Sequence, residues 1–151
     1  MASLRPDGTK QISLSREQYK EINTALRAFY QETKCTLIAL CDISGLIIAQ
    51  SGTFNPTKAT LLSALAAGNY LATQEIGKLI GEKDGFKVEF HEGSEQNLYI
   101  TSVDETHILT VVFTQNSTFG MVRLLAAKLT KELEATFSHD KPQELPATNV
   151  A

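Results

Sequence analysis

The segment from residue 57 to residue 81 has helical spacing and almost no charge, and it limits the possible folds of this chain more than any other feature. Its only charged side chains are Lys58, Glu75 and Lys78. At about 100° per residue, the larger apolar residues form one broad stripe that we expect to face the core: Leu61, Leu62, Leu65, Ala72, Ile76, Leu79 and Ile80. An ordinary surface helix is polar on its other side, but here that side also carries apolar residues: Ala64, Ala67, Tyr70 and Leu71. The helix therefore needs a second layer of protein.

Length and composition favour a single domain without nucleic-acid or membrane partners. A chain of 151 residues with 42% hydrophobic residues is long enough for one complete core and too short for two. Its net charge of -3 gives no basic surface for nucleic acid and no polybasic membrane patch. No apolar run is long enough for a membrane span, and the first residues lack the apolar core of a signal peptide, so we expect a cytoplasmic protein. We expect a flexible leader at residues 1–14, one domain at 15–138 and a disordered tail at 139–151.

The cysteine and histidine positions predict neither a disulfide nor a metal site. Cys35 and Cys41 lie in one apolar run, and in a strand they would share a face about 20 Å apart. That distance excludes a bond between them, so we interpret both as buried core thiols. His91, His107 and His139 are scattered, and none has a second His or Cys at a ligand spacing. We therefore expect no metal and no cofactor.

Capping and turn signals divide the chain into helices and strands. Ser15 and Gln18 form a capping-box pattern, and Asn55 followed by Pro56 is typical of a helix start. The expected elements are a helix at 15–32, strands at 35–41 and 46–50, a helix at 57–81, strands at 86–91, 98–103 and 107–113, and a final helix capped by Ser117.

This order, α-β-β-α-β-β-β-α, predicts an α/β protein of the α+β type. Because the connections are short and neighbouring strands are antiparallel, we expect one five-stranded antiparallel sheet. The long central helix should cover one face of the sheet, and the two terminal helices should cover the other face.

The chain lacks the motifs of common catalytic and nucleotide-binding sites. It has no Gly-Lys-Ser/Thr phosphate loop and no Gly-x-Gly-x-x-Gly motif after a strand. Glu89 and His91 share one side of a predicted strand, whereas Glu92 lies at the following turn. We therefore predict no catalytic residue and no enzyme activity of the chain itself.

Two features of the central helix indicate a close contact. Gly68 lies inside it, where glycine costs about 1 kcal/mol relative to alanine. Either this glycine lets the helix lie near the sheet, or it lets another protein approach. Tyr70 and Leu71 on the outward side favour a contact surface, because contiguous exposed apolar patches are candidate interfaces.

Six short motifs occur in the order typical of one known family. They are Asp42-Ile-Ser-Gly-Leu-Ile-Ile48, Ala66-Ala-Gly-Asn69, Lys78-Leu-Ile-Gly-Glu82, Phe90-His-Glu-Gly93, Leu98-Tyr99, and Phe113 with residues 117–124. Together they resemble the roadblock family of small-GTPase regulators, and most closely its bacterial branch. The resemblance covers residues 15–138 and implies a roadblock/profilin-like sandwich.

The resemblance also implies partners and a regulatory role. In this family a homodimer forms when two central helices pack side by side and the sheets join. One Ras-like small GTPase then binds per dimer through its switch region, and the dimer stimulates GTP hydrolysis without an arginine finger, in the control of cell polarity or motility. The implied GTPase contact is Ala64, Ala67, Gly68, Leu71, Glu75 and Lys78. The implied dimer contact is Ser63, Tyr70, Gln74, Lys87, Val88, Glu89, Phe90 and His91.

Two other functions fit the same pattern of elements. One is a scaffold or adaptor dimer that binds proteins without affecting nucleotide turnover. The other is a small-molecule sensor, because helix-covered antiparallel sheets also form ligand pockets. The bulky residues Phe86, Phe90 and Tyr99 argue against a large cavity.

Overall fold

The computed structural model describes residues 13–138, and its elements follow the predicted order. Residues 1–12 of the predicted leader and the whole predicted tail, residues 139–151, lie outside the described residues. The elements are α1 (Arg16–Thr33), β1 (Leu37–Asp42), β2 (Ile47–Gly52), α2 (Pro56–Leu79), β3 (Val88–Glu92), β4 (Gln96–Ser102), β5 (His107–Thr114) and α3 (Phe119–Ser138).

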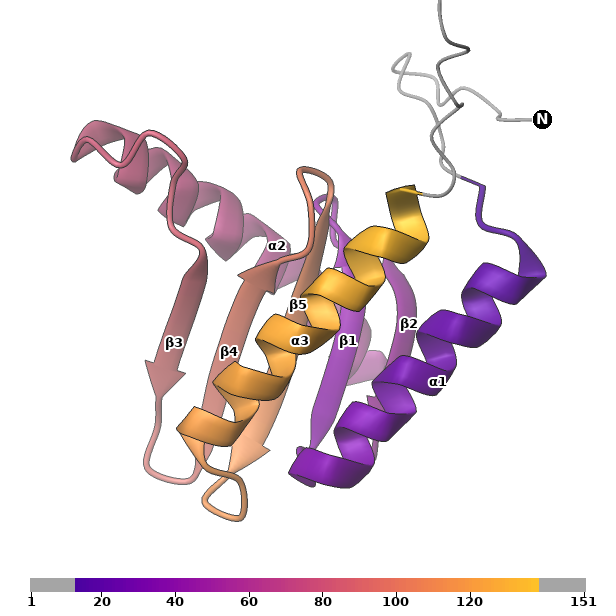
Figure 1. The fold of residues 1–151 in the computed structure, drawn as a ribbon. Coiled ribbons are helices and arrows are strands. Elements are labelled where there is room, and N and C mark those ends of the chain that lie inside the picture. The colour runs from indigo at the N-terminus through magenta and orange to yellow at the C-terminus, as the bar shows by residue number, and fades with distance from the viewer. Residues whose placement is uncertain (1–12, 139–151) are drawn as a thin grey trace, which may run out of the picture.

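The strands form one five-stranded sheet in the order β2-β1-β5-β4-β3, and each neighbouring pair is antiparallel. Strands β2 and β3 are therefore the two edges. Helices α1 and α3 lie side by side on one face of the sheet, and α2 crosses the other face (Figure 1). This arrangement confirms the predicted α+β fold, with the central and terminal helices on opposite faces.

Each face of the sheet has its own core. On the side of α1 and α3, the largest core joins Ile22 of α1, Leu133 of α3 and Ile38 of β1. On the side of α2, small residues of the helix, such as Ala59, pack against the sheet, where Ala39 lies beside the larger Leu37 and Val112. Small side chains on the buried side of α2 allow the helix to lie close to the sheet.

The orientation of α2 is opposite to the prediction. The predicted core residues Leu61 and Leu65 are 63% and 64% exposed. The other exposed members of that predicted stripe are Ala72, Ile76, Leu79 and Ile80. The buried residues of α2 are all small: Ala59, Ser63, Ala66, Ala67 and Gly77. Leu62 and Tyr70 are partly buried against the sheet beside them. Both sides of the helix are apolar, so periodicity alone could not predict which side faces the sheet. The side with the small residues faces it, because only small side chains allow a close approach.

The β1–β2 turn packs against the middle of α2. Asp42 Oδ1 accepts hydrogen bonds from the backbone N–H groups of Ser44 and Leu46 at 3.0 and 3.1 Å. Gly45 has φ +92°, and a Cβ added to it would lie 2.6 Å from the Cα of Ala64. The turn therefore holds α2 against the sheet through a backbone contact for which only glycine is small enough.

The cysteines are buried core thiols as predicted, but they do not share a face. Cys35 belongs to the core beneath α1 and α3, and Cys41 belongs to the core beneath α2. The prediction of a shared face was wrong because β1 begins at Leu37, so strand alternation does not extend back to Cys35. Burial raises the pKa of the Cys41 thiol to about 12, and the negative charge of Asp42 adds to this effect. Burial also raises the pKa of Cys35, so neither thiol is activated as a nucleophile.

The helix starts agree with the sequence signals except at α3. Ser15 and Gln18 form the predicted capping box, and Asn55 caps α2. At α3 the backbone N–H of Met121 donates instead to the Thr118 hydroxyl at 3.2 Å. Ser117 is buried, and its hydroxyl donates to the carbonyl of Thr33. The prediction that Ser117 caps α3 was therefore wrong, since this side chain ties the end of α1 to the loop before α3.

Candidate functional site

The outer face of α2 is an exposed apolar surface. Its most exposed large residue is Leu79, at 87%, and Leu46 of the β1–β2 turn, at 61%, lies on the neighbouring loop. The exposed apolar residues of this segment are Leu61, Leu65, Leu71, Ile76, Leu79 and Ile80. Scattered exposed leucines are common in monomers, but a contiguous set on one helix is typical of a protein-binding site.

Helical geometry divides this face into two sides. We define the leucine side as Leu61, Leu65, Ala72, Ile76 and Leu79, and the loop side as Ala64, Gly68, Leu71, Glu75 and Lys78. Leu65 and Ile76 lie one turn from Asn69 and Thr73, which hydrogen-bond to the edge strand β3. Ala64 lies against Gly45. The leucine side is thus turned toward β3, and the loop side is turned toward the β1–β2 turn.

A cluster of polar side chains joins α2 to β3. Asn69 Nδ2 donates to Glu89 Oε1 at 3.0 Å, and Thr73 Oγ1 donates to the same oxygen at 2.6 Å. His91 Nε2 lies 3.9 Å from Glu89 Oε1. Glu89 is only 9% exposed, and its Oε2 has no hydrogen-bond partner among the described residues. One carboxylate oxygen is therefore well satisfied, and the other is buried without a partner, which is costly.

Five of the six predicted GTPase-contact residues lie together on the surface. The five exposed residues are those of the loop side: Ala64, Gly68, Leu71, Glu75 and Lys78. Lys78 Nζ pairs with Glu75 Oε1 at 3.0 Å on this surface. Ala67 is only 2% exposed because it packs against the sheet, so its placement on the contact surface was wrong.

The predicted dimer contact is divided between the surface and the core. Ser63 is fully buried, Tyr70 packs against the sheet core, and Gln74 Nε2 donates to the Phe86 carbonyl at 2.8 Å. Ser63 cannot reach a second copy, so placing it on a self-contact was wrong, because the observed orientation of α2 differs from the predicted one. Tyr70 and Gln74 are partly exposed, so their place on a self-contact stays a prediction. The predicted strand residues lie on or beside the free edge strand β3: Lys87, Val88, Glu89, Phe90 and His91.

The leucine side and Leu46 were not predicted to be surface residues. The signal that could have found them is the size difference between the two apolar sides of α2. One face of the helix carries only small residues at helical spacings of three, four and eleven positions: Ala59, Ser63, Ala66 and Gly77. A helix that packs closely on a sheet uses its small face for that contact.

Gly68 is not required by the fold. It is exposed, and an added Cβ would meet no atom within 4 Å, so the interpretation that it lets α2 approach the sheet is wrong. We expect Gly68→Ala to raise the free energy of unfolding by about 1 kcal/mol, because alanine favours a helix interior over glycine. Urea denaturation measures this change. Gly77→Ala is the control, since its Cβ would lie 3.3 Å from the Cα of Gly85 and should give no gain; a destabilised Gly68→Ala would contradict the assignment.

Comparison with known proteins identifies the family. The model of the Roadblock/LC7 domain matches residues 21–113, which is more than half of the chain. The chain belongs to the Roadblock/LC7 family. This roadblock domain is similar to Myxococcus xanthus MglB, with 30% identity, a TM-score of 0.79, and coverage of 89% of this chain and 100% of that chain.

Two further solved structures are similar over most of their length. The gliding protein MglB of Thermus thermophilus has 27% identity and a TM-score of 0.79, and the match covers 85% of this chain and 97% of that one. A structure described as MglB with a tetrameric arrangement has 26% identity and a TM-score of 0.80, with coverage of 86% and 97%.

The arginines that the structure describes lie away from the outer face of α2. Arg16 and Arg27 are on α1, and Arg123 is on α3, so all three belong to helices on the opposite face of the sheet. Within residues 13–138 of this roadblock domain, no arginine is carried by α2 or by the loops around it.

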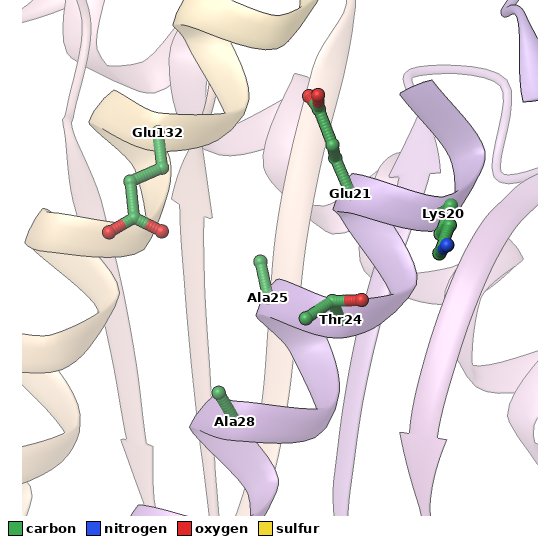
Figure 2. A pocket seen from close by; sticks show the side chains of 6 residues that line it. All are labelled: Lys20, Glu21, Thr24, Ala25, Ala28 and Glu132. Atoms are coloured by element: carbon green, nitrogen blue, oxygen red, sulfur yellow. The ribbon is translucent and has the colours of Figure 1, made fainter. Parts of the chain in front are cut away.

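A shallow groove lies between α1 and α3, on the side of the sheet opposite α2. Figure 2 shows Ala25 and Ala28 of α1 and Glu132 of α3 bordering it, together with exposed polar residues of α1. Its volume is about 470 Å³. The lining residues other than Ala25 are exposed, and specific ligand sites usually have convergent, enclosed polar groups. The groove therefore gives little support to a small-molecule sensor.

The described part of the chain shows neither a membrane helix nor a metal cluster. None of its helices is both long and apolar enough to cross a bilayer. Within residues 13–138, no three His, Cys, Asp or Glu side chains come together as they would around a metal ion.

Proposed function

We propose that this roadblock domain is a homodimeric regulator of a small Ras-like GTPase. It binds the switch region of the GTPase and stimulates GTP hydrolysis, in the control of cell polarity or motility. The observation that carries the proposal is the exposed apolar outer face of α2, beside the open edge strand β3. Membership of the roadblock family and the similarity to MglB support it, and one relative is named as a gliding protein.

The two sides of α2 serve different partners in this proposal. The leucine side lies next to β3, so both can contact a second copy at once, and burial of the leucines supplies the main favourable energy. The loop side then remains open for the GTPase, with Leu71 as its apolar anchor and Glu75 and Lys78 as polar neighbours. One GTPase binds per dimer, because the loop sides of two adjacent α2 helices form one continuous surface.

The regulator acts by positioning rather than by supplying a catalytic side chain. No arginine within residues 13–138 belongs to α2 or its neighbouring loops, so the described surface has no arginine finger to offer. Stimulation instead comes from contacts that stabilise the hydrolysis-competent arrangement of the GTPase's own residues. Differential binding to that arrangement is sufficient to raise the rate.

Replacing Leu71 by arginine tests the contact. Phosphate release is followed for each Ras-like small GTPase encoded in the same genome, alone and with saturating wild-type protein. We expect Leu71→Arg to reduce the stimulation at least about tenfold, because a desolvated cation replaces an apolar anchor. The control is Leu124→Arg, on α3 across the sheet, where the wild-type leucine is 71% exposed; it should stimulate like wild type.

The same experiment separates the alternatives. If Leu71→Arg stimulates as well as wild type, the loop side is not the GTPase contact. If the wild-type protein binds a GTPase without changing its rate, the chain is an adaptor and the activating role is wrong. If it binds none of the GTPases, the proposed function is wrong.

A further inference from the structure

Two buried hydroxyl groups lie between α2 and the sheet. Ser63 of α2 and Thr110 of β5 are both 0% exposed, and neither hydroxyl oxygen has a hydrogen-bond partner among the described residues. A buried hydroxyl that makes no hydrogen bond is costly, so each of these groups needs an explanation. The contact proposed for the outer face of α2 involves neither residue.

The backbone of α2 does not supply a partner for the Ser63 hydroxyl. On the same helix, the hydroxyl of Thr60 donates to the carbonyl of Pro56 one turn earlier, at 3.2 Å. On α1, the hydroxyl of Thr33 likewise donates to the carbonyl of Phe29 at 2.8 Å. Ser63 makes no such bond, so its hydroxyl is available for a bond toward the sheet.

Thr110 lies at the boundary between two apolar clusters beneath α2. The first cluster contains Ala39 of β1 and Val112 of β5, and the second contains Ile100 of β4 and Ile108 of β5. Along β5, Thr110 lies between Ile108 and Val112 and points to the same face as both. Across the sheet, it is paired with Ala39 on one side and Ile100 on the other. The two clusters therefore meet around Thr110.

Ser63 lies at the same boundary on the helix. One turn before it, Ala59 belongs to the first cluster. About one turn after it, Ala66 belongs to the second cluster. Because the helix residues on both sides of Ser63 pack with the neighbours of Thr110, the side chains of Ser63 and Thr110 face each other between α2 and the sheet.

We propose that Ser63 and Thr110 together bind one buried water molecule between α2 and the sheet. The two hydroxyls are not in direct hydrogen-bond contact, and a water that bonds to both gives each of them a partner. The buried residues of α2 are all small, so no bulky helix side chain occupies this contact. The water ties the middle of α2, whose outer side carries the proposed contact surface, to the centre of the sheet.

Removal of the two hydroxyls, singly and together, tests whether they share a partner. Ser63→Ala and Thr110→Val each remove one hydroxyl with little change in shape, and the full-length variants are unfolded in urea at one chain concentration. We expect each single substitution to raise the ratio of unfolded to folded chain about fivefold, because the other hydroxyl and the water lose a bond. The double variant should raise this ratio no further than the single ones, since the water and both polar groups are then removed together.

The double variant distinguishes a shared partner from two separate ones. If the effects of Ser63→Ala and Thr110→Val multiply, the two hydroxyls have independent partners and the proposal is wrong. It is also wrong if either single substitution stabilises the chain. The control combines Thr110→Val with Thr136→Val on α3, whose hydroxyl donates to the carbonyl of Glu132 at 3.1 Å; these two effects should multiply.

A high-resolution crystal structure of the wild-type chain tests the water itself. We expect one ordered water about 2.8 Å from both Ser63 Oγ and Thr110 Oγ1, and none at this place in the double variant. A direct hydrogen bond between the two hydroxyls, or a bond from each to its own backbone, would overturn the proposal. Neither result bears on the binding of a GTPase, so the proposed function stands or fails separately.

Discussion

Leu65→Arg should convert the protein from a dimer to a folded monomer. Leu65 lies on the leucine side of α2 and is 64% exposed in the single chain, so the chain loses little on its own when this residue is replaced. In the proposed dimer each copy buries this leucine. Its loss costs about 2 kcal/mol per copy, or about 4 kcal/mol per dimer, which weakens association roughly 1,000-fold. Sedimentation equilibrium across a range of concentrations measures this change.

The matched control for this variant is Leu124→Arg, which exchanges a similarly exposed leucine on α3. It should leave both the dimer and the melting temperature unchanged. Leu65→Arg should likewise melt at the temperature of a dilute wild-type monomer. A Leu65→Arg protein that still dimerises at wild-type affinity would exclude the leucine side from the interface.

Gly45→Ala should destabilise the chain by about 3 kcal/mol. The backbone of Gly45 has φ +92°, a conformation that costs an L-residue about 1–2 kcal/mol. Its new Cβ would also lie 2.6 Å from the Cα of Ala64, and a backbone neighbour cannot rotate away. Either the β1–β2 turn or α2 must move, which adds a strain of similar size. The free energy of unfolding is measured by chemical denaturation of Leu65→Arg with and without Gly45→Ala. In this monomeric variant dimerisation makes no contribution to the difference.

Gly81→Ala separates the two parts of this cost. Gly81 has φ +97°, but its added Cβ would meet no atom within 4 Å. We therefore expect it to lose only the conformational part, about 1–2 kcal/mol. If Gly45→Ala and Gly81→Ala lower the free energy of unfolding equally, the close contact between the turn and α2 adds nothing to the cost of the Gly45 substitution.

The elements and their order could be predicted because local signals agree with the final structure. The capping box at Ser15 and the Asn55–Pro56 start coincide with observed helix starts. The alternation after Phe86 marks β3, although the observed strand begins at Val88. Ser117 and Thr118 are equally suitable caps by composition, and only the tertiary contact of Ser117 with Thr33 decides between them.

The orientation of α2 could not be predicted from the sequence. The sequence singled out α2 and the strand after it, and the family resemblance added the partner class. The rotation of α2 depends on how closely the helix approaches the sheet, which is a property of facing side chains on β1 and β5. Ser63 and Ala67 were assigned to the surface because a larger apolar stripe usually faces the core. Here the larger stripe is exposed.

The polar cluster between α2 and β3 could be predicted only in part. Glu89 and His91 are two residues apart on a strand, so their common side was evident. Their partners Asn69 and Thr73 are separated from them by a long stretch of chain, and only the fold brings α2 beside the edge strand. The unpartnered oxygen of Glu89 could not be anticipated from residue types, because it depends on which atoms the two α2 side chains contact.

The mass of the complex in solution tests the proposed regulator most directly. Light scattering coupled to size exclusion is applied to the wild-type chain alone, and then with a Ras-like GTPase from the same genome loaded with a non-hydrolysable GTP analogue. We expect a dimer of about 33 kDa, twice the chain mass of 16.5 kDa, that gains one GTPase per two chains. A monomeric chain, or a dimer that binds none of the GTPases in either nucleotide state, would contradict it.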